Sequence, residues 1–175
     1  TLVFLSRIHH KKGLELLFEA LSQVHFEFQL QIAGDGEEEY VEQLKQLAID
    51  LQIAEKIEWV GWINDEPKYQ LLANADLFAL TSHNENFAMV VIESLAVGTP
   101  VLLSDKVGLS DYVQAQELGW ICPLAVSKIR EYLQAIFEEK ETLAKIRAKA
   151  PAQIYQDFSA ESIARRYVEA YDANQ

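Results

Sequence analysis

Residues 77–103 read LFALTSHNENFAMVVIESLAVGTPVLL, which is the pattern of a strand, a loop, a helix and a second strand. Leu77–Thr81 and Pro100–Leu103 are short apolar runs of the kind that form buried strands. Between them, apolar residues from about position 87 to 97 point to nearly every side of a helix, so we expect this helix to be largely buried. A strand, a helix and a second strand in this order are the building unit of a parallel sheet.

The same alternation of apolar runs and amphipathic helical stretches continues along the chain. It predicts an α/β fold, namely a Rossmann-like doubly wound parallel sheet of about six strands with helices on both faces. The expected strands are Leu2–Leu5, Phe28–Ala33, Ile57–Val60, Leu77–Thr81, Pro100–Leu103 and Gly119–Cys122. The expected helices include residues 14–24, residues 41–51, a helix from Asn64 or Asp65 to about Ala73, and a last helix from about Ala160 to Tyr171.

Size and composition narrow the choice of function. The 175 residues suffice for one domain with a full core over residues 1–158 and a C-terminal helix over 159–175. A net charge of −12 argues against a nucleic-acid partner. Cys122 is the only cysteine, and no apolar run is long enough to span a bilayer. We therefore expect a soluble protein of the cytoplasm.

Glu93 is a lone charge in the apolar helix after residue 87. An uncompensated carboxylate in such a place costs several kcal/mol, on the order of what an unpaired buried polar group costs. Glu93 therefore needs a partner, which is either an Arg or Lys from elsewhere in the fold or a ligand rich in hydroxyl donors.

The first strand is followed by a cationic loop, Arg7-Ile8-His9-His10-Lys11-Lys12-Gly13, and then by a helix. Ligands of doubly wound sheets bind at the carboxyl ends of the strands, and a helix N-terminus favours anions. Arg7 and Lys12 are therefore candidate phosphate ligands, whereas a solvated loop is the simpler interpretation of Lys11. The adjacent histidines cannot readily converge on one metal ion, so no metal site is expected.

Two further loops lie at the same edge of the predicted sheet. Gly34 follows the second strand, where glycine permits a tight turn and close approach to a ligand. Glu85 follows the fourth strand at the mouth of the site, and the backbone N–H groups of residues 87–89 are expected in the first helical turn, where they favour an anion. Glu93, about two turns further, can accept hydrogen bonds from a vicinal diol such as a ribose. Together with the cationic loop, these groups describe a site for a nucleotide-sugar.

These motifs resemble the signature of retaining glycosyltransferases of the GT-B fold, the large family four that includes sucrose synthase and many polysaccharide and lipopolysaccharide enzymes. Glu85 and Glu93, eight positions apart, and the segment SLAVGTPV at 94–101 carry most of the resemblance. Residues 6–14, SRIHHKKGL, are similar to that family's G-R-x-x-x-x-K-G-x loop, with Ser6 in place of the usual Gly. Further similar segments are IAGDG at 32–36, VGW at 60–62, NADLFALTS at 74–82 and the helix after Phe158-Ser159.

The resemblance implies roles for individual residues. Arg7 and Lys12 would contact the donor diphosphate and stabilise charge on the leaving group. Glu85 and the backbone at Phe87, Ala88 and Met89 would hold the donor sugar and the distal phosphate. Glu93 would bind the ribose hydroxyls, and Trp62 and Ile63 would lie beside the nucleobase. No cofactor and no metal would be needed, because the cationic pair does the work of a divalent ion.

The chain departs from the family pattern at two places. The usual Gly-Phe-Gly after the first glutamate is Asn86-Phe87-Ala88, so Ala88 stands where the backbone needs the freedom of glycine, and strain is expected there. The usual glycine-rich loop and glutamate are missing around residues 107–111, and no role is assigned to that segment.

The resemblance implies the C-terminal, donor-binding half of a GT-B enzyme. Such an enzyme transfers a hexose-like unit from a nucleoside diphosphate sugar to a hydroxyl of a glycan, lipid or small molecule, with retention, in polysaccharide or glycoconjugate biosynthesis. The acceptor would bind to an N-terminal domain absent from this chain. The protein would be cytoplasmic, with a peripheral association with the membrane, through the missing domain, as the alternative. Two alternatives are a nucleotide-sugar epimerase of the same fold and a non-enzymatic nucleotide-sugar-binding subunit.

Overall fold

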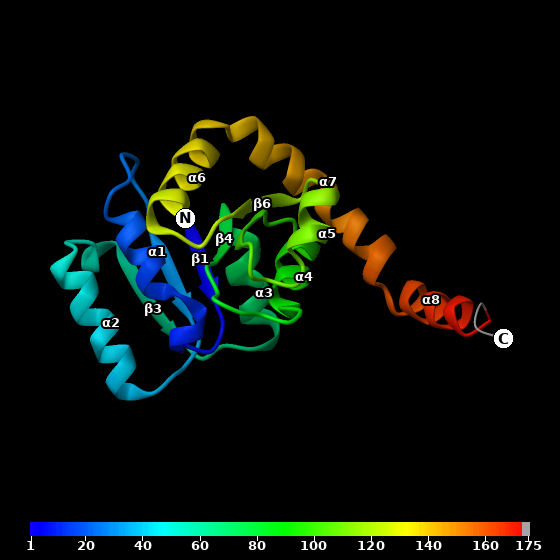
Figure 1. The fold of residues 1–175 in the computed structure, drawn as a ribbon, viewed down its shortest axis with the longest axis horizontal. Coiled ribbons are helices and arrows are strands. Elements are labelled where there is room, and N and C mark those ends of the chain that lie inside the picture. Colours follow the sequence, from blue (N-terminus) through cyan, green and yellow to red (C-terminus); the bar gives the residue numbers. More distant parts are fainter. Residues whose placement is uncertain (173–175) are drawn as a thin grey trace.

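A computed structural model describes residues 1–172 of the protein (Figure 1). Its centre is one sheet of six parallel strands in the order β3-β2-β1-β4-β5-β6. The strands are β1 (Leu2–Leu5), β2 (Leu30–Ala33), β3 (Ile57–Gly61), β4 (Leu77–Leu80), β5 (Val101–Ser104) and β6 (Gly119–Cys122). The predicted fold class is therefore confirmed, and the order of the strands reverses between β1 and β4.

Helices cover both faces of the sheet. The helices are α1 (Leu14–Leu21), α2 (Glu38–Asp50), α3 (Asp65–Asn74), α4 (Met89–Ala96), α5 (Ser110–Ala115), α6 (Val126–Glu138), α7 (Lys140–Phe158) and α8 (Ala160–Asp172). In one layer α1 packs against α2 and α6, and in the other α4 packs against α3 and α7 (Figure 1). Short 3-10 helices at His10–Lys12 and Ala54–Lys56 precede α1 and β3.

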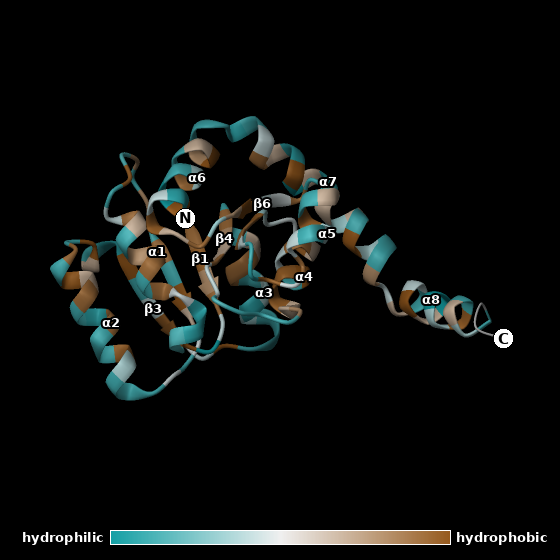
Figure 2. Ribbon diagram, viewed as in Figure 1, coloured by the Kyte–Doolittle hydropathy of each residue, from teal (hydrophilic) through white to brown (hydrophobic). Residues whose placement is uncertain are grey.

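The central strands are apolar because both of their faces are covered. Every residue of β4 and β5 is buried, and the ribbon of β4 has the brown colour of hydrophobic residues in Figure 2. Phe4, Phe18 and Phe78 are the largest fully buried side chains. Removal of this apolar surface from water is the main term that stabilises such a fold.

Small differences from the predicted boundaries have local causes. The strand predicted from Phe28 begins at Leu30, and Phe28 instead packs edge-on against Phe26. Pro100 lies just outside β5, since it has no N–H to donate, but its carbonyl accepts a 2.9 Å hydrogen bond from the N–H of Phe78. Asn64 occupies the predicted N-cap position of α3 but makes no side-chain capping hydrogen bond.

The C-terminal helix α8 projects away from the sheet beyond the end of α7 (Figure 1). None of its residues is buried. The predicted start at Ala160 is confirmed, and the helix includes the predicted last residue, Tyr171, and extends to Asp172, the last residue that the structure describes. Across residues 1–172, no helix combines the length and the apolar character needed to cross a membrane.

Candidate nucleotide-sugar site

The point where the strand order reverses positions the candidate site. In a doubly wound sheet of this order, the loops after the two strands that flank this point diverge and leave a crevice for a ligand. Here these are the loop after β1, with Arg7 and Lys12, and the loop after β4, with Glu85. The two loops contact each other, because the N–H of His83 donates a 2.8 Å hydrogen bond to the carbonyl of Lys11.

An ion pair joins the two loops. Lys12 Nζ donates to Glu85 Oε2, and the two side chains are only 15% and 22% exposed. Thr81, at the end of β4, donates from its hydroxyl to the carbonyl of Gly13, at 2.8 Å. Lys12 and Glu85 were predicted to contact different parts of one ligand, and the structure brings them into direct contact.

The cationic loop rests on the loop after β2. The N–H of Ile8 donates a 2.7 Å hydrogen bond to the carbonyl of Asp35. Gly34 has a φ of +143°, and a Cβ placed on it would lie 1.8 Å from the carbonyl oxygen of Ser6. The glycine predicted to admit a ligand is therefore required, first of all, for close packing under the segment that carries Arg7.

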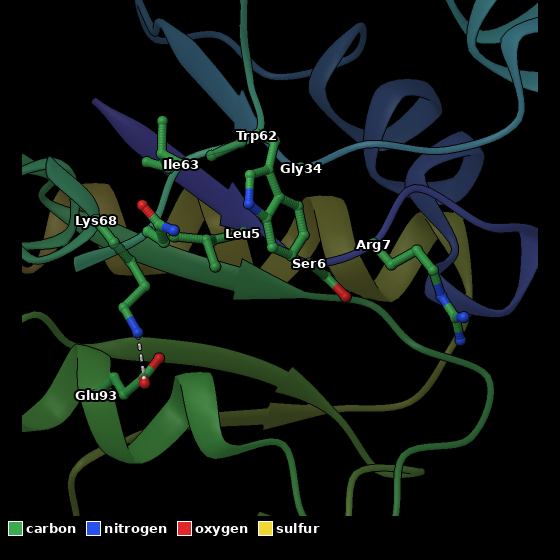
Figure 3. Close-up of a pocket in the computed structure, with 10 residues that line it drawn as sticks. Leu5, Ser6, Arg7, Gly34, Trp62, Ile63, Lys68 and Glu93 are labelled. Atoms are coloured by element: carbon green, nitrogen blue, oxygen red, sulfur yellow. Dashed lines mark hydrogen bonds and ion pairs between the residues drawn. The ribbon is translucent and has the colours of Figure 1, made fainter.

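A pocket of about 230 Å³ opens at the ends of β1 and β2. Ten residues line it: Leu5, Ser6, Arg7, Ala33, Gly34, Trp62, Ile63, Asn64, Lys68 and Glu93. Figure 3 shows the indole of Trp62 above the end of β1, with Arg7 on one side of the pocket and Glu93 on the other. Trp62 is 69% exposed, so its ring is free to stack on a planar group. The pocket thus combines a cation, a carboxylate and an aromatic face.

Glu93 has a basic partner within the protein. Lys68 Nζ, from α3, donates to Glu93 Oε1 at 2.7 Å, and the side chains are 18% and 22% exposed (Figure 3). The sequence left open whether an internal base or a ligand pairs with this carboxylate, and the internal base is Lys68. Glu93 lines the pocket, and its Oε2 makes no hydrogen bond within residues 1–172.

The helix α4 begins at Met89, within the predicted range of Phe87 to Met89. The expectation that Phe87 and Ala88 belong to its first turn is wrong, because both precede the helix and Ala88 adopts a left-handed conformation with φ +60° and ψ +72°. The side chains of Phe87 and Met89 are exposed. The strain expected from an alanine at a glycine position is therefore present in the backbone.

A segment without an assigned role supports the Glu85 loop. The N–H of Glu85 donates to the carbonyl of Lys106 at 3.1 Å, and the N–H of Gly108 donates to the carbonyl of Glu85 at 2.7 Å. A Cβ on Gly108 would lie 1.9 Å from the carbonyl oxygen of Asn86. The only trace of this contact in the sequence is Gly108 itself, because no local sequence pattern predicts which two distant loops will touch.

The structure divides the predicted site residues into three groups. One group lines the pocket and consists of Arg7, Gly34, Trp62, Ile63 and Glu93. A second group is the ion pair of Lys12 and Glu85. The third lies at the start of α4 and consists of Phe87, Ala88 and Met89. Within residues 1–172, no three His, Cys, Asp or Glu side chains are grouped as a metal site would require.

Comparison with known proteins identifies relatives of the whole chain. The family model described as glycosyl transferases group 1 matches residues 1–153. An uncharacterized glycosyltransferase, MJ1607, from Methanocaldococcus jannaschii is 27% identical over 97% of this chain and 44% of its own length. The lipopolysaccharide core biosynthesis glycosyltransferase LpsE of Rhizobium meliloti is 26% identical over 94% of this chain and 47% of its own. The chain therefore spans about half the length of these relatives.

Solved structures show the same fold. HepE from Anabaena in complex with UDP superimposes with a TM-score of 0.87 at 26% identity, over 98% of this chain and 48% of that one. The same protein in complex with UDP-glucose superimposes with a TM-score of 0.82 at 27% identity, with the same coverage of both chains. From the family match over residues 1–153, this chain belongs to the glycosyl transferases group 1 family, and its sheet is the Rossmann-like domain of a GT-B glycosyltransferase.

Proposed function

We propose that the chain is the donor-binding domain of a retaining glycosyltransferase. It binds a nucleoside diphosphate sugar, and the whole protein transfers a hexose-like unit to a hydroxyl acceptor. The observation that carries this proposal is the meeting of a cationic loop and two carboxylates at the reversal of the strand order. The complexes of HepE with UDP and UDP-glucose support the same class of ligand.

The pocket suits the nucleoside half of the donor. The exposed ring of Trp62 and the side chain of Ile63 offer an apolar surface for the base. Glu93 lies across the pocket, where its free oxygen accepts hydrogen bonds from the ribose hydroxyls. Arg7 lies on the side toward the cationic loop, where its guanidinium binds the diphosphate in bidentate fashion.

Lys12 and the start of α4 suit the distal phosphate and the sugar of the donor. The C1–O bond of the sugar breaks as the diphosphate leaves, and negative charge grows on the distal phosphate. Lys12 stabilises that charge electrostatically, with no metal or cofactor invoked. The N-terminus of α4, at Ala88 and Met89, adds the positive end of the helix dipole. Glu85 then turns from Lys12 toward the sugar hydroxyls as the phosphate takes its place beside the ammonium.

The acceptor is proposed to bind elsewhere. The relatives are about twice as long as this chain, so we propose that a second domain supplies the acceptor site and closes over the donor. A glycan, a lipid or a small molecule with a free hydroxyl would serve as acceptor. The relative named for lipopolysaccharide core biosynthesis favours a glycoconjugate.

Titration calorimetry of the 175-residue chain with UDP, GDP and ADP tests the proposal. At least one nucleotide should bind, and Arg7→Ala and Glu93→Ala should each weaken it by about 10-fold or more, the worth of one charge-assisted hydrogen bond. Arg165→Ala is the control, because Arg165 is an exposed cation on α8. No binding of any nucleotide, or equal affinities in both site variants and the wild type, would overturn the proposed function.

A binding protein without transferase activity is the second candidate. The left-handed Ala88 favours it, because the methyl group would stand where, in the proposed site, the donor phosphate approaches the backbone. A transfer assay on the protein with its second domain separates the two, since a binding subunit forms no glycoside. Epimer formation without acceptor would instead select an epimerase, and the anomeric configuration of any product tests retention.

A further inference from the structure

Lys68 belongs to the pocket and was not among the residues predicted to form it. It lies in the first turn of α3, and its ammonium reaches across to Glu93 Oε1 on α4 at 2.7 Å. Both groups line the same cavity as Arg7 and Trp62 (Figure 3). This ion pair is therefore part of the wall that a ligand would touch.

The environment of the pair is only partly aqueous. The Lys68 side chain is 18% exposed, and its Nζ also lies 4.6 Å from the centre of the Tyr69 ring. Burial lowers the pKa of Lys68, but the hydrogen bond and the charge of Glu93 outweigh that effect and raise the pKa above its usual value. The ammonium is therefore charged throughout the neutral range, and Glu93 always faces a full positive charge.

The geometry leaves acceptor capacity on Glu93. An ionised carboxylate has about four lone-pair positions on its two oxygens. Lys68 occupies one of them on Oε1, so Oε2 and a second position on Oε1 can accept the two adjacent hydroxyls of a diol. Without the ammonium, the Glu93 side chain, which is only 22% exposed, would lose the ion pair that fixes its orientation.

We propose that Lys68 is a positioning residue for ribose recognition, which holds the Glu93 carboxylate in the orientation in which it accepts hydrogen bonds from both vicinal hydroxyls of the donor nucleoside. The proposal rests on the proposed function of the pocket. It assigns to Lys68 the preference of the site for ribonucleotides over deoxyribonucleotides, although Lys68 itself need not touch the ligand.

A different result is expected if the Lys68–Glu93 ion pair has only a structural role. Loss of such a pair would lower stability, and it would weaken ribonucleotides and deoxyribonucleotides by the same factor. A positioning role instead couples Lys68 to the hydroxyls, so its removal should weaken the ribonucleotide more than the deoxyribonucleotide. The ratio of the two affinities therefore separates the two roles.

The experiment measures dissociation constants of UDP, 2′-deoxy-UDP and 3′-deoxy-UDP by calorimetry on the 175-residue chain. If UDP is not the nucleotide that binds most tightly, the same series of the tightest base replaces it. The wild type should prefer the ribonucleotide by about 10-fold over each deoxy analogue, the value of one hydrogen bond to a charged group. Lys68→Met, which keeps the apolar stem, should reduce this preference to about 2-fold or less, with UDP weakened about 10-fold.

Three further variants make the result specific. Lys68→Arg should restore most of the preference, because a guanidinium also donates to a carboxylate. Glu93→Gln should lose the preference as Lys68→Met does. Lys128→Met removes a lysine that pairs with Glu131, also at 2.7 Å, on α6 and outside the pocket, and it should change neither affinity nor preference.

The outcomes distinguish this inference from the function on which it rests. A wild-type chain that binds no nucleotide would overturn both. A wild-type chain that binds UDP, together with an unchanged preference in Lys68→Met, would overturn the role of Lys68 and leave the nucleotide site in place. Failure of Lys68→Arg to restore the preference, in a variant with the wild-type melting temperature, would also overturn it.

Discussion

The ammonium of Lys12 and the carboxylate of Glu85 form an ion pair between the loop after β1 and the loop after β4, on either side of the strand-order reversal. The side chains of the pair are only 15% and 22% exposed. In the proposed function, the diphosphate of the donor binds beside Lys12. If the diphosphate binds there as proposed, the negative charge of Glu85 would repel it. The pair would then link the affinity for the diphosphate to the proposed contact of Glu85 with the sugar.

Glu85→Gln should separate these two effects. The amide removes the like charge and frees Lys12, so UDP is expected to bind several-fold tighter, in line with a change of about 1 kcal/mol for one partly exposed charge. UDP-glucose should lose its advantage over UDP, because the amide is a poorer acceptor for sugar hydroxyls. Calorimetry with both ligands measures the two changes.

Glu131→Gln is the matched control for this prediction. Glu131 also pairs with a lysine, but it lies on α6 at the exposed surface. The affinities of the Glu131→Gln variant for UDP and UDP-glucose should equal those of the wild type. Weaker UDP binding by Glu85→Gln would show that the carboxylate supports the phosphate site and does not compete with it.

Lys12 and Lys11 offer a direct comparison within one loop. Lys12 is part-buried beside Glu85, whereas Lys11 is exposed, and no ion pair of Lys11 is present in the described part of the chain. Lys12→Met should weaken UDP by about 10-fold to 100-fold, since it removes a largely buried cation from the proposed phosphate site. Lys11→Met should change the affinity by about 2-fold at most, as expected of a solvent-screened charge. Equal losses in the two variants would show that the whole loop, and not Lys12, attracts the phosphate.

Much of the fold was predictable because it depends on local patterns. Six short apolar runs in an alternating chain specify a parallel sheet with covered faces, and all six strands were located to within two residues. Arg7 and Glu93 were also predictable as neighbours of one pocket, because the strand ends of a doubly wound sheet meet at one edge.

The residues that contact the site residues were harder to predict from the sequence. Lys68 has no local feature that marks it as the partner of Glu93, since the contact depends on how α3 packs against α4. The support of Glu85 by Gly108 depends likewise on two loops that are separated in the sequence. Ala88 was predicted to be strained, whereas its left-handed conformation, which keeps Phe87 and Ala88 out of the first helical turn, was not predictable from the sequence.

Ala88→Gly should stabilise the protein. A non-glycine residue in the left-handed region costs about 1 kcal/mol or more, and glycine removes that cost at the price of a more flexible unfolded chain. The net gain is expected to be about 0.5–1 kcal/mol, or a melting temperature about 2–4 °C higher for a domain of this size. Thermal unfolding monitored by circular dichroism measures the shift.

Ala148→Gly is the opposite control. Ala148 is an exposed residue inside α7, where glycine costs about 0.5–1 kcal/mol relative to alanine, so this variant should melt at a lower temperature. A lower melting temperature in both variants would show that contacts of the Ala88 methyl group outweigh the strain of its backbone.

We expect the buried thiol of Cys122 to make the folded protein less stable as the pH rises above about 9. Its thiol is fully buried in β6, and burial, with a smaller effect of the Asp105 carboxylate, raises its pKa from 9.0 to about 12. The folded protein thus keeps the proton in a range where the unfolded chain releases it. The thiol's contribution to stability is complete below about pH 9 and declines between pH 9 and 12, by roughly 1 kcal/mol per pH unit.

Cys122→Ala should remove this part of the alkaline decline. Urea unfolding at pH 7, 9 and 10.5 should show a smaller fall in the free energy of unfolding for the variant than for the wild type, even though the variant starts lower because a small cavity remains. Iodoacetamide at pH 8 should leave the folded wild type unmodified and alkylate it in urea, since the reactive thiolate forms only when the strand is exposed. Rapid alkylation of the folded protein would show that β6 opens readily, and parallel declines in the two proteins would show that Cys122 does not carry the pH dependence.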